Sequence, residues 1–168
     1  MLSKERHQTA IGPGSVAVAS GKVGYCLFVG SRLTDWGTSR IAGLSPKAAP
    51  RVMTRWLTSF RPDVVITEDI PHDSRKQDRS RVITAAVASI ARDDVSIMDV
   101  TLERVQAFPN KDDEAEALAV EFPELELHLP KRRRLWETES LRTIVFEAVA
   151  LAKLLFADPT PVMARAMR

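Results

Sequence analysis

The chain has 168 residues, 45% of them hydrophobic and 27% charged, which is typical of one soluble globular domain with a substantial core. Its net charge of +2 says little by itself, and the only cysteine, Cys26, excludes an internal disulfide and a zinc site built on thiolates. No stretch has the character of a signal peptide or of a membrane span, so we expect a cytoplasmic protein without a membrane partner.

The N-terminal part of the sequence, over residues 15–43, is rich in short runs of residues that favour β-strands. Residues 1–14 are expected to be a flexible lead-in. Residues 15–19 and 23–29 flank a Ser-Gly-Lys turn and predict a hairpin, and residues 31–43 could supply a third strand. Together these segments predict an antiparallel meander.

Helices and strands then alternate, ending in a long apolar helix and a flexible tail over residues 158–168. In order they are a helix with Ser45 as its N-cap, a buried strand over 64–67, a polar loop over 72–80, a helix over 81–92, a strand over 95–100, an acidic helix over 112–121, an irregular basic connection over 127–139, and a last helix from Glu139 or Ser140 to about Phe156. A meander followed by alternating elements predicts an α/β domain over residues 15–157, with helices packed on a mixed sheet.

Charge is distributed unevenly. Basic residues outnumber acidic ones over residues 1–60, and every charged residue over 112–127 is acidic. A run of four basic residues follows and could contact a phosphate backbone, although a solvated surface is an equally good interpretation. The aromatic residue beside this run could stack on a base or a ribose, or could anchor the core. The candidate nucleic-acid contacts are Lys22, Lys131, Arg132, Arg133, Arg134 and Trp136.

Glu147 is the most conspicuous acidic residue, because it lies in a helix that is apolar on nearly every side. A carboxylate there is costly unless it is paired or binds a cation. Arg142 and Lys153 lie five and six residues away, so neither can reach it along the helix. Glu147 is therefore a candidate metal ligand. The alternatives are an ion pair with an arginine from elsewhere in the fold, or an edge position open to water.

Three further glutamates could join such a site. Glu68 ends the strand over 64–67, and sites in α/β sheets gather where strands end, although a solvent-facing carboxylate is the simpler interpretation. Glu137 and Glu139 precede the last helix within reach of Glu147, and Glu139 could instead cap that helix. The candidate catalytic residues are thus Glu68, Glu137, Glu139 and Glu147, with Glu68 and Glu147 as the metal ligands. Asp99, at the end of its expected strand, is a weaker candidate.

Three short motifs follow one another along the chain: Gly24-Tyr25 in the second strand, Pro62-Asp63 leading into the strand that ends at Glu68, and the acid Glu147 before an alanine-rich run. In this order they resemble the RuvC-type branch of the ribonuclease H-like superfamily, which contains Holliday-junction resolvases. The resemblance implies a sheet of about five strands with helices on both faces. It also implies an endonuclease that hydrolyses phosphodiesters with Mg²⁺ or Mn²⁺, acts on DNA more than on RNA, and works as a homodimer.

The chain also departs from that family. The family's first-strand aspartate falls on Ala19, or on Ala17 without a gap, and a second helix acid would fall on Ile144. Two hypotheses follow from the resemblance: a nuclease with an altered acidic site, or a catalytically inactive module of the same fold that binds nucleic acid or a protein partner.

Overall fold

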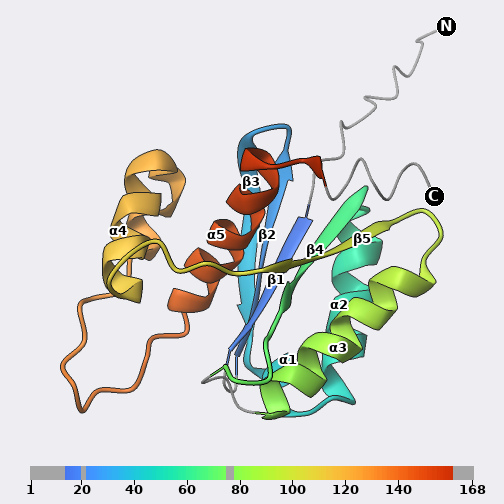
Figure 1. The fold of residues 1–168 in the computed structure, drawn as a ribbon, viewed down its shortest axis with the longest axis horizontal. Coiled ribbons are helices and arrows are strands. Elements are labelled where there is room, and N and C mark those ends of the chain that lie inside the picture. The colour runs from blue at the N-terminus through green and yellow to red at the C-terminus, as the bar shows by residue number, and fades with distance from the viewer. Residues whose placement is uncertain (1–13, 20–21, 75–77, 161–168) are drawn as a thin grey trace, which may run out of the picture.

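The computed structural model describes residues 14–19, 22–74 and 78–160, which form an α/β structure (Figure 1). The elements are, in chain order, β1 (Gly14–Ala19), β2 (Lys22–Val29), β3 (Arg32–Ser39), α1 (Arg40–Leu44), α2 (Ala48–Phe60), β4 (Val64–Asp69), α3 (Asp78–Asp93), β5 (Met98–Glu103), α4 (Lys111–Glu121), the 3₁₀ helix η1 (Pro123–His128) and α5 (Thr143–Ala157).

The strands form one mixed sheet in the order β3-β2-β1-β4-β5. β1 lies at its centre, antiparallel to β2 and parallel to β4, and β5 extends the parallel half. The carboxyl ends of β1, β4 and β5 therefore point to the same edge of the sheet. This carboxyl edge is where sites gather in α/β sheets.

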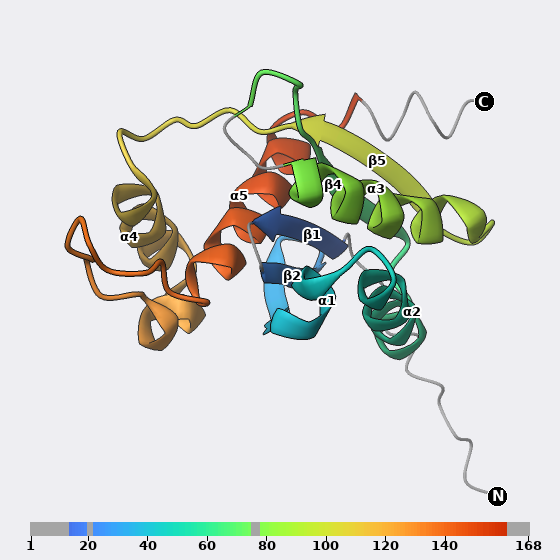
Figure 2. The ribbon, with the colours of Figure 1, turned by 90° about the horizontal axis from the view of Figure 1, so that it is seen from below.

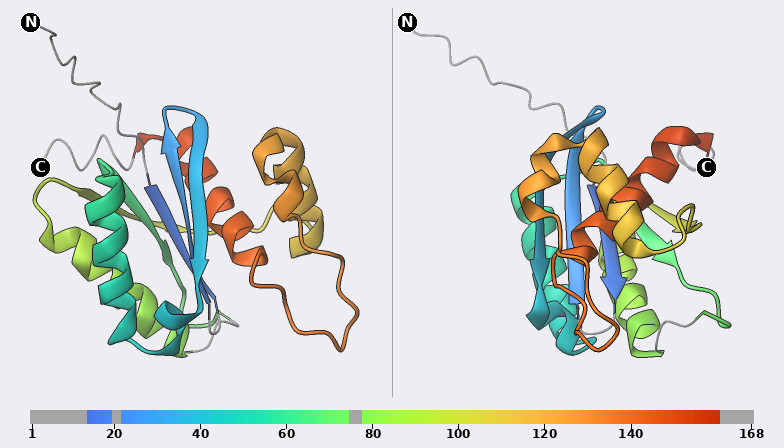
Figure 3. Two further views of the ribbon diagram at one scale, coloured as in Figure 1. Left: turned by 180° about the vertical axis from the view of Figure 1, so that it is seen from behind. Right: turned by 90° about the vertical axis from the view of Figure 1, so that its left-hand side faces the viewer.

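Helices cover both faces of the sheet (Figures 2 and 3). On one face, α1, α2 and α3 enclose a core that includes Met53, Val65 and Ile83. On the other, α5 crosses β1 and β2 over a larger core that includes Phe28 and Phe146, and α4 packs beside α5, farther from the sheet. Both faces of the sheet are covered at β4, where the consecutive residues Val65, Ile66, Thr67 and Glu68 are all buried.

Gly24 lets α5 lie close to the sheet. A Cβ at this position would lie 2.8 Å from Cγ2 of Ile144 and 3.0 Å from its backbone oxygen. The Gly-Tyr motif seen in the sequence therefore has a packing role: Gly24 faces α5, and Tyr25 faces the opposite core against Trp56 and Phe60 of α2.

Several predicted element boundaries were wrong because local turns compete with the longer pattern. β3 ends at Ser39, whose hydroxyl accepts from Ala42 N and starts α1, so residues 40–43 are helical. Ser45 accepts a hydrogen bond from Ala48 N but forms a turn, and α2 starts at Ala48. Asp94 closes another turn by accepting from Ser96 N, which moves the next strand to 98–103.

The last helix also starts later than predicted, at Thr143, because Thr143 N donates to Ser140 O in a preceding turn. Among the described residues, no helix is both long enough and apolar enough to cross a membrane. The expected flexible lead-in and tail lie outside the described residues, apart from Gly14 and residues 158–160.

Candidate acidic centre and nucleic-acid interface

Glu147 is deeply buried in α5, with 1% of its surface exposed, and two cationic side chains reach its carboxylate. The Lys111 ammonium lies 2.6 Å from one oxygen, and the Arg104 guanidinium lies 3.4 Å from the other. Of the alternatives that the sequence left open for Glu147, the contact with an arginine from elsewhere in the fold is therefore present.

Both cations also contact a second carboxylate. Arg104 forms a close ion pair with Glu114, and Lys111 lies 3.0 Å from Glu139. Lys22 extends the chain of charges, since its ammonium donates to the backbone oxygen of Glu139 at 2.5 Å. We call this set the buried charge network; its members are Lys22, Arg104, Lys111, Glu114, Glu139 and Glu147.

The network forms because the connection between β5 and α4 crosses in front of α5 (Figure 1). Arg104 directly follows β5, and Lys111 is the first residue of α4, where Asn110 caps the helix by accepting from Asp113 N. Glu114 lies three residues after Lys111 and thus on the same side of α4. The loop after β5 and the first turn of α4 therefore place Arg104, Lys111 and Glu114 near Glu147.

Burial and charge shift the pKa values within the network. Burial opposes the charge on Lys111, but the Glu147 and Glu139 carboxylates outweigh it, and the pKa of Lys111 is raised. Burial raises the pKa of Glu114, with Arg104 opposing the shift. Burial also lowers the pKa of Lys22, which Glu139 partly offsets. Lys111 consequently keeps its proton and its positive charge at neutral pH.

Glu68 is buried as well, with 9% of its surface exposed. β4 ends at Asp69, two residues beyond the predicted strand over 64–67, so Glu68 lies inside the strand. Alternation along β4 places it on the α5 face with Ile66, which belongs to the core under α5. A cleft of about 200 Å³ lies between β4 and α3, and its lining includes Glu68, Asp69, Arg81 and Arg92.

The described residues do not fit the divalent-metal centre that the resemblance implies. Among them, no group of three or more His, Cys, Asp or Glu side chains is placed to hold a metal ion. Glu147 meets two protein cations where a metal ligand was expected. β1, with the sequence GSVAVA, has no acidic residue, and its register sets Ala17 opposite Gly24 and Ala19 opposite Lys22.

The other predicted acids have different surroundings. Glu139 shares Lys111 with Glu147, so the structure does bring these two glutamates together. Glu137 lies outside the network, in an exposed turn where it accepts from Arg134 N at 2.9 Å. Asp99 is buried near the start of β5, not its end, and pairs with Arg92 at 3.5 Å.

Of the six predicted nucleic-acid contacts, Lys22 and Arg132 bind other groups of the protein, and the remaining four are exposed to solvent. Lys22 is buried and donates to backbone oxygens just before α5. Arg132 is bound to Asp113 and Glu116 of α4. Lys131, Arg133, Arg134 and Trp136 are exposed, and Trp136 is not a core anchor, because 77% of its surface is accessible.

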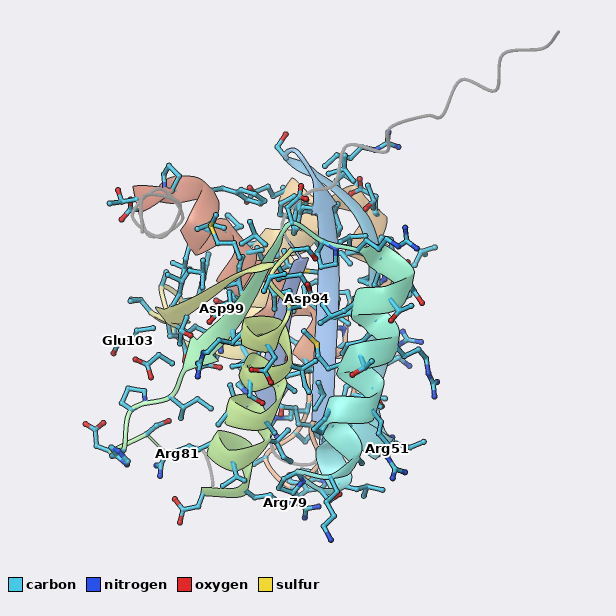
Figure 4. The ribbon with its side chains drawn as sticks, turned by 90° about the vertical axis from the view of Figure 1, so that its right-hand side faces the viewer. Arg51, Arg79, Arg81, Asp94, Asp99 and Glu103 are labelled. Carbon is cyan, nitrogen blue, oxygen red and sulfur yellow. The ribbon has the colours of Figure 1, made fainter. Side chains whose placement is uncertain are left out.

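Sequence reasoning did not single out two pairs of residues that lie at the candidate sites. Arg104 and Lys111 belong to a loop and a helix start, where no periodicity indicates which partners they meet. Arg51 and Arg79 lie near the first turns of α2 and α3, at the carboxyl edge, whereas Asp94 lies at the opposite end of α3 (Figure 4). The basic bias over residues 1–60 was a partial signal for Arg51.

Neither a known protein-family model nor a curated protein matches this chain. Solved structures do. A fowlpox virus resolvase in complex with Holliday junction DNA matches with a TM-score of 0.58 at 16% identity, over 86% of this chain and 98% of that one. Thermus thermophilus RuvC matches with a TM-score of 0.52 at 13% identity, over 84% and 95%. The yeast mitochondrial Holliday junction resolvase Ydc2 matches with a TM-score of 0.50 at 10% identity, over 86% and 78%.

These likenesses, at low identity, establish the architecture. The chain has a RuvC-type ribonuclease H-like fold, as the three sequence motifs indicated.

Proposed function

We propose that this protein binds nucleic acid, DNA in preference to RNA, and does so without metal-dependent hydrolysis. The observation that carries the proposal is the pair of cations on Glu147. Lys111 and Arg104 occupy both carboxylate oxygens of the residue that the resemblance assigns to metal binding.

A divalent ion at Glu147 would have to compete with these cations inside the protein. Removing one partner from a buried ion pair typically costs about 3–5 kcal/mol, because a charge is left without compensation. The incoming ion would find no carboxylate on β1 to act as a second ligand. Hard cations need several oxygen ligands at once, and the other two carboxylates of the network, Glu114 and Glu139, are themselves paired with Arg104 and Lys111.

Binding requires only accessible positive charge, and the chain provides it in two places. One is the connection over residues 129–142, with Lys131, Arg133 and Arg134 exposed. The other is the carboxyl edge near the starts of α2 and α3, with Arg51 and Arg79. Helix N-termini attract phosphate, and basic side chains near them add to that attraction. The fowlpox virus resolvase of the same fold is seen with Holliday junction DNA, which makes a branched duplex the first substrate to test.

The test is fluorescence anisotropy with labelled four-way junction, linear duplex and RNA hairpin in EDTA, over a range of salt concentrations. We expect DNA binding that weakens steeply with salt. The double variant Lys131→Ala/Arg133→Ala should weaken binding to all DNA probes and reduce the salt slope by about one for each phosphate that is no longer neutralised. Lys153→Ala is the matched control, since Lys153 is a surface lysine of α5 that is paired with Glu121. Binding that is absent or independent of salt would refute the proposal.

A further inference from the structure

The basic connection before α5 contains a tight turn that presents two large apolar side chains to solvent. Glu137 N donates to Arg134 O at 3.0 Å, and the Glu137 carboxylate accepts from Arg134 N at 2.9 Å. The turn is thus closed twice, once through the backbone and once through a side chain. Its two corner residues are Leu135 and Trp136.

Both corner residues are open to water. Leu135 is 103% and Trp136 is 77% exposed, whereas Trp36 and Trp56 are packed against the two cores. A pair of large apolar side chains at the tip of a projecting loop does not contribute to folding. Its exposure has a cost that binding would recover, so the pair marks an interaction site.

The turn is also held in place at its base. Arg132 makes three hydrogen bonds of 2.8–2.9 Å to Asp113 and Glu116 of α4. After the turn, Arg142 donates to Leu127 O at 3.3 Å. The connection extends away from the rest of the molecule (Figure 3), so the turn is presented with its orientation limited from both sides. Preorganisation of this kind reduces the entropic cost of binding.

The charges beside the turn indicate what it binds. Lys131 and Arg133 are exposed, and the Arg134 guanidinium lies 5.6 Å from the centre of the Trp136 ring. Positive charge would attract phosphates, while the indole face and the leucine offer an apolar platform. Single-stranded nucleic acid is recognised by this combination of basic groups and stacking aromatic rings. The three cations favour a polyanion over an apolar groove on a protein, because phosphates pair with them and apolar side chains do not.

We infer that Trp136, supported by Leu135, stacks on unpaired bases, so that the chain prefers nucleic acid with exposed bases to continuous duplex. The inference rests on the proposed function and specifies the substrate class for it. Bases inside a duplex are already stacked, and opening a step costs a few kcal/mol, which a single tryptophan does not fully offset.

The experiment compares the binding of single-stranded DNA and of linear duplex by the full chain and its variants. Trp136→Ala should weaken binding to single-stranded DNA by about tenfold and leave duplex binding within about twofold. Trp136→Phe should retain most of the affinity, because a phenyl ring still stacks. Tryptophan fluorescence should be quenched by single-stranded DNA in the wild type and much less in Trp136→Ala. Arg133→Ala is the comparison variant and should weaken both ligands alike.

The outcomes separate this inference from the proposed function. If the wild type binds DNA and Trp136→Ala binds single-stranded DNA as tightly as the wild type does, base stacking is refuted while nucleic-acid binding stands. If Trp136→Ala loses both ligands in equal proportion, the preference for unpaired bases is refuted. If the wild type binds no nucleic acid, both proposals fall. Because Trp136 is exposed, its removal should leave the urea unfolding midpoint unchanged, so a loss of affinity will not reflect misfolding.

Discussion

Arg104 is the residue on which the buried charge network depends most, since it serves two buried carboxylates at once. Its side chain is 8% exposed and contacts Glu114 and Glu147, which are 7% and 1% exposed. Arg104→Met keeps much of the side-chain volume but leaves an excess of negative charge inside the protein. We expect the free energy of unfolding to fall by about 3 kcal/mol or more, measured by urea denaturation.

The matched control is Arg132→Met, which removes an arginine that also has two carboxylate partners, Asp113 and Glu116, but lies at the surface. Exposed pairs contribute about 0–1 kcal/mol, so this variant should lose little stability. An equal fall in the free energy of unfolding in Arg104→Met and Arg132→Met would contradict the burial of the network. A double-mutant cycle between Arg104 and Glu147 would then measure their coupling directly.

Tyr25 offers a clean spectroscopic test, because it is the only tyrosine in the chain. Burial, reinforced by the nearby Asp35 carboxylate, raises the pKa of Tyr25 to about 12. The folded state therefore holds the phenolic proton to higher pH than the unfolded chain, whose pKa is about 10. This contribution to stability is complete below about pH 10 and is lost as the pH rises toward 12.

Titration followed at the phenolate absorbance band should show almost no ionisation at about pH 10 in the folded protein, and half ionisation there in urea. Tyr25→Phe should flatten the loss of stability above that pH. A native midpoint near the ordinary value would mean that the ring is not packed between β2 and α2 as described.

At the scale of elements, α5 is fixed on the sheet by the close approach at Gly24. Gly24→Ala would place a methyl group 2.8 Å from Cγ2 of Ile144 and 3.0 Å from its backbone oxygen. A backbone atom cannot rotate away, so α5 or β2 must shift. We expect a loss of about 1–3 kcal/mol in urea unfolding.

Gly14→Ala is the comparison variant for this contact. An added Cβ there would lie 3.3 Å from Pro62 Cβ, a tight but tolerable contact, and the loss should be smaller. If Gly24→Ala is as stable as the wild type, the close seating of α5, and with it the position of Glu147, is incorrect.

The elements also indicate what the sequence could and could not predict. Runs of β-branched and aromatic residues located the strands around Val16, Cys26 and Ile66, because these residue types favour strands. Errors arose at Ser45 and Asp94, where a side chain closes a turn and delays the next element. Such hydrogen bonds compete with helix and strand over a few residues, and a window of ten or more averages them out.

The same reasoning applies to the candidate site. The burial of Glu147 and its need for a partner followed from the apolar helix around it. Its partners did not, because Arg104 and Lys111 reach it through a crossover that depends on the whole topology. Glu139 lies beside Glu147 through their shared Lys111, whereas Glu137 was not distinguishable from Glu139 until the turn at Arg134 was seen.

At the scale of the whole molecule, the RuvC-type fold combines a buried glutamate, Glu147, that is paired with two protein cations, and exposed basic side chains on its surface. Both features agree with a protein that binds nucleic acid at its surface and holds protein cations, in place of a metal ion, at Glu147. Binding should then be the same in EDTA and in Mg²⁺, apart from the general weakening that added salt produces. A true metal requirement for binding would appear instead as loss of affinity in EDTA at matched ionic strength.

The most direct test is incubation of an end-labelled four-way DNA junction with the protein in EDTA, Mg²⁺ and Mn²⁺, with binding and cleavage read from native and denaturing gels of one sample. We predict a shifted, intact junction under all three conditions, and the same result for Glu68→Gln. Metal-dependent nicks that disappear in both Glu68→Gln and Glu147→Gln would contradict the proposal and would show that these two glutamates form a working metal site.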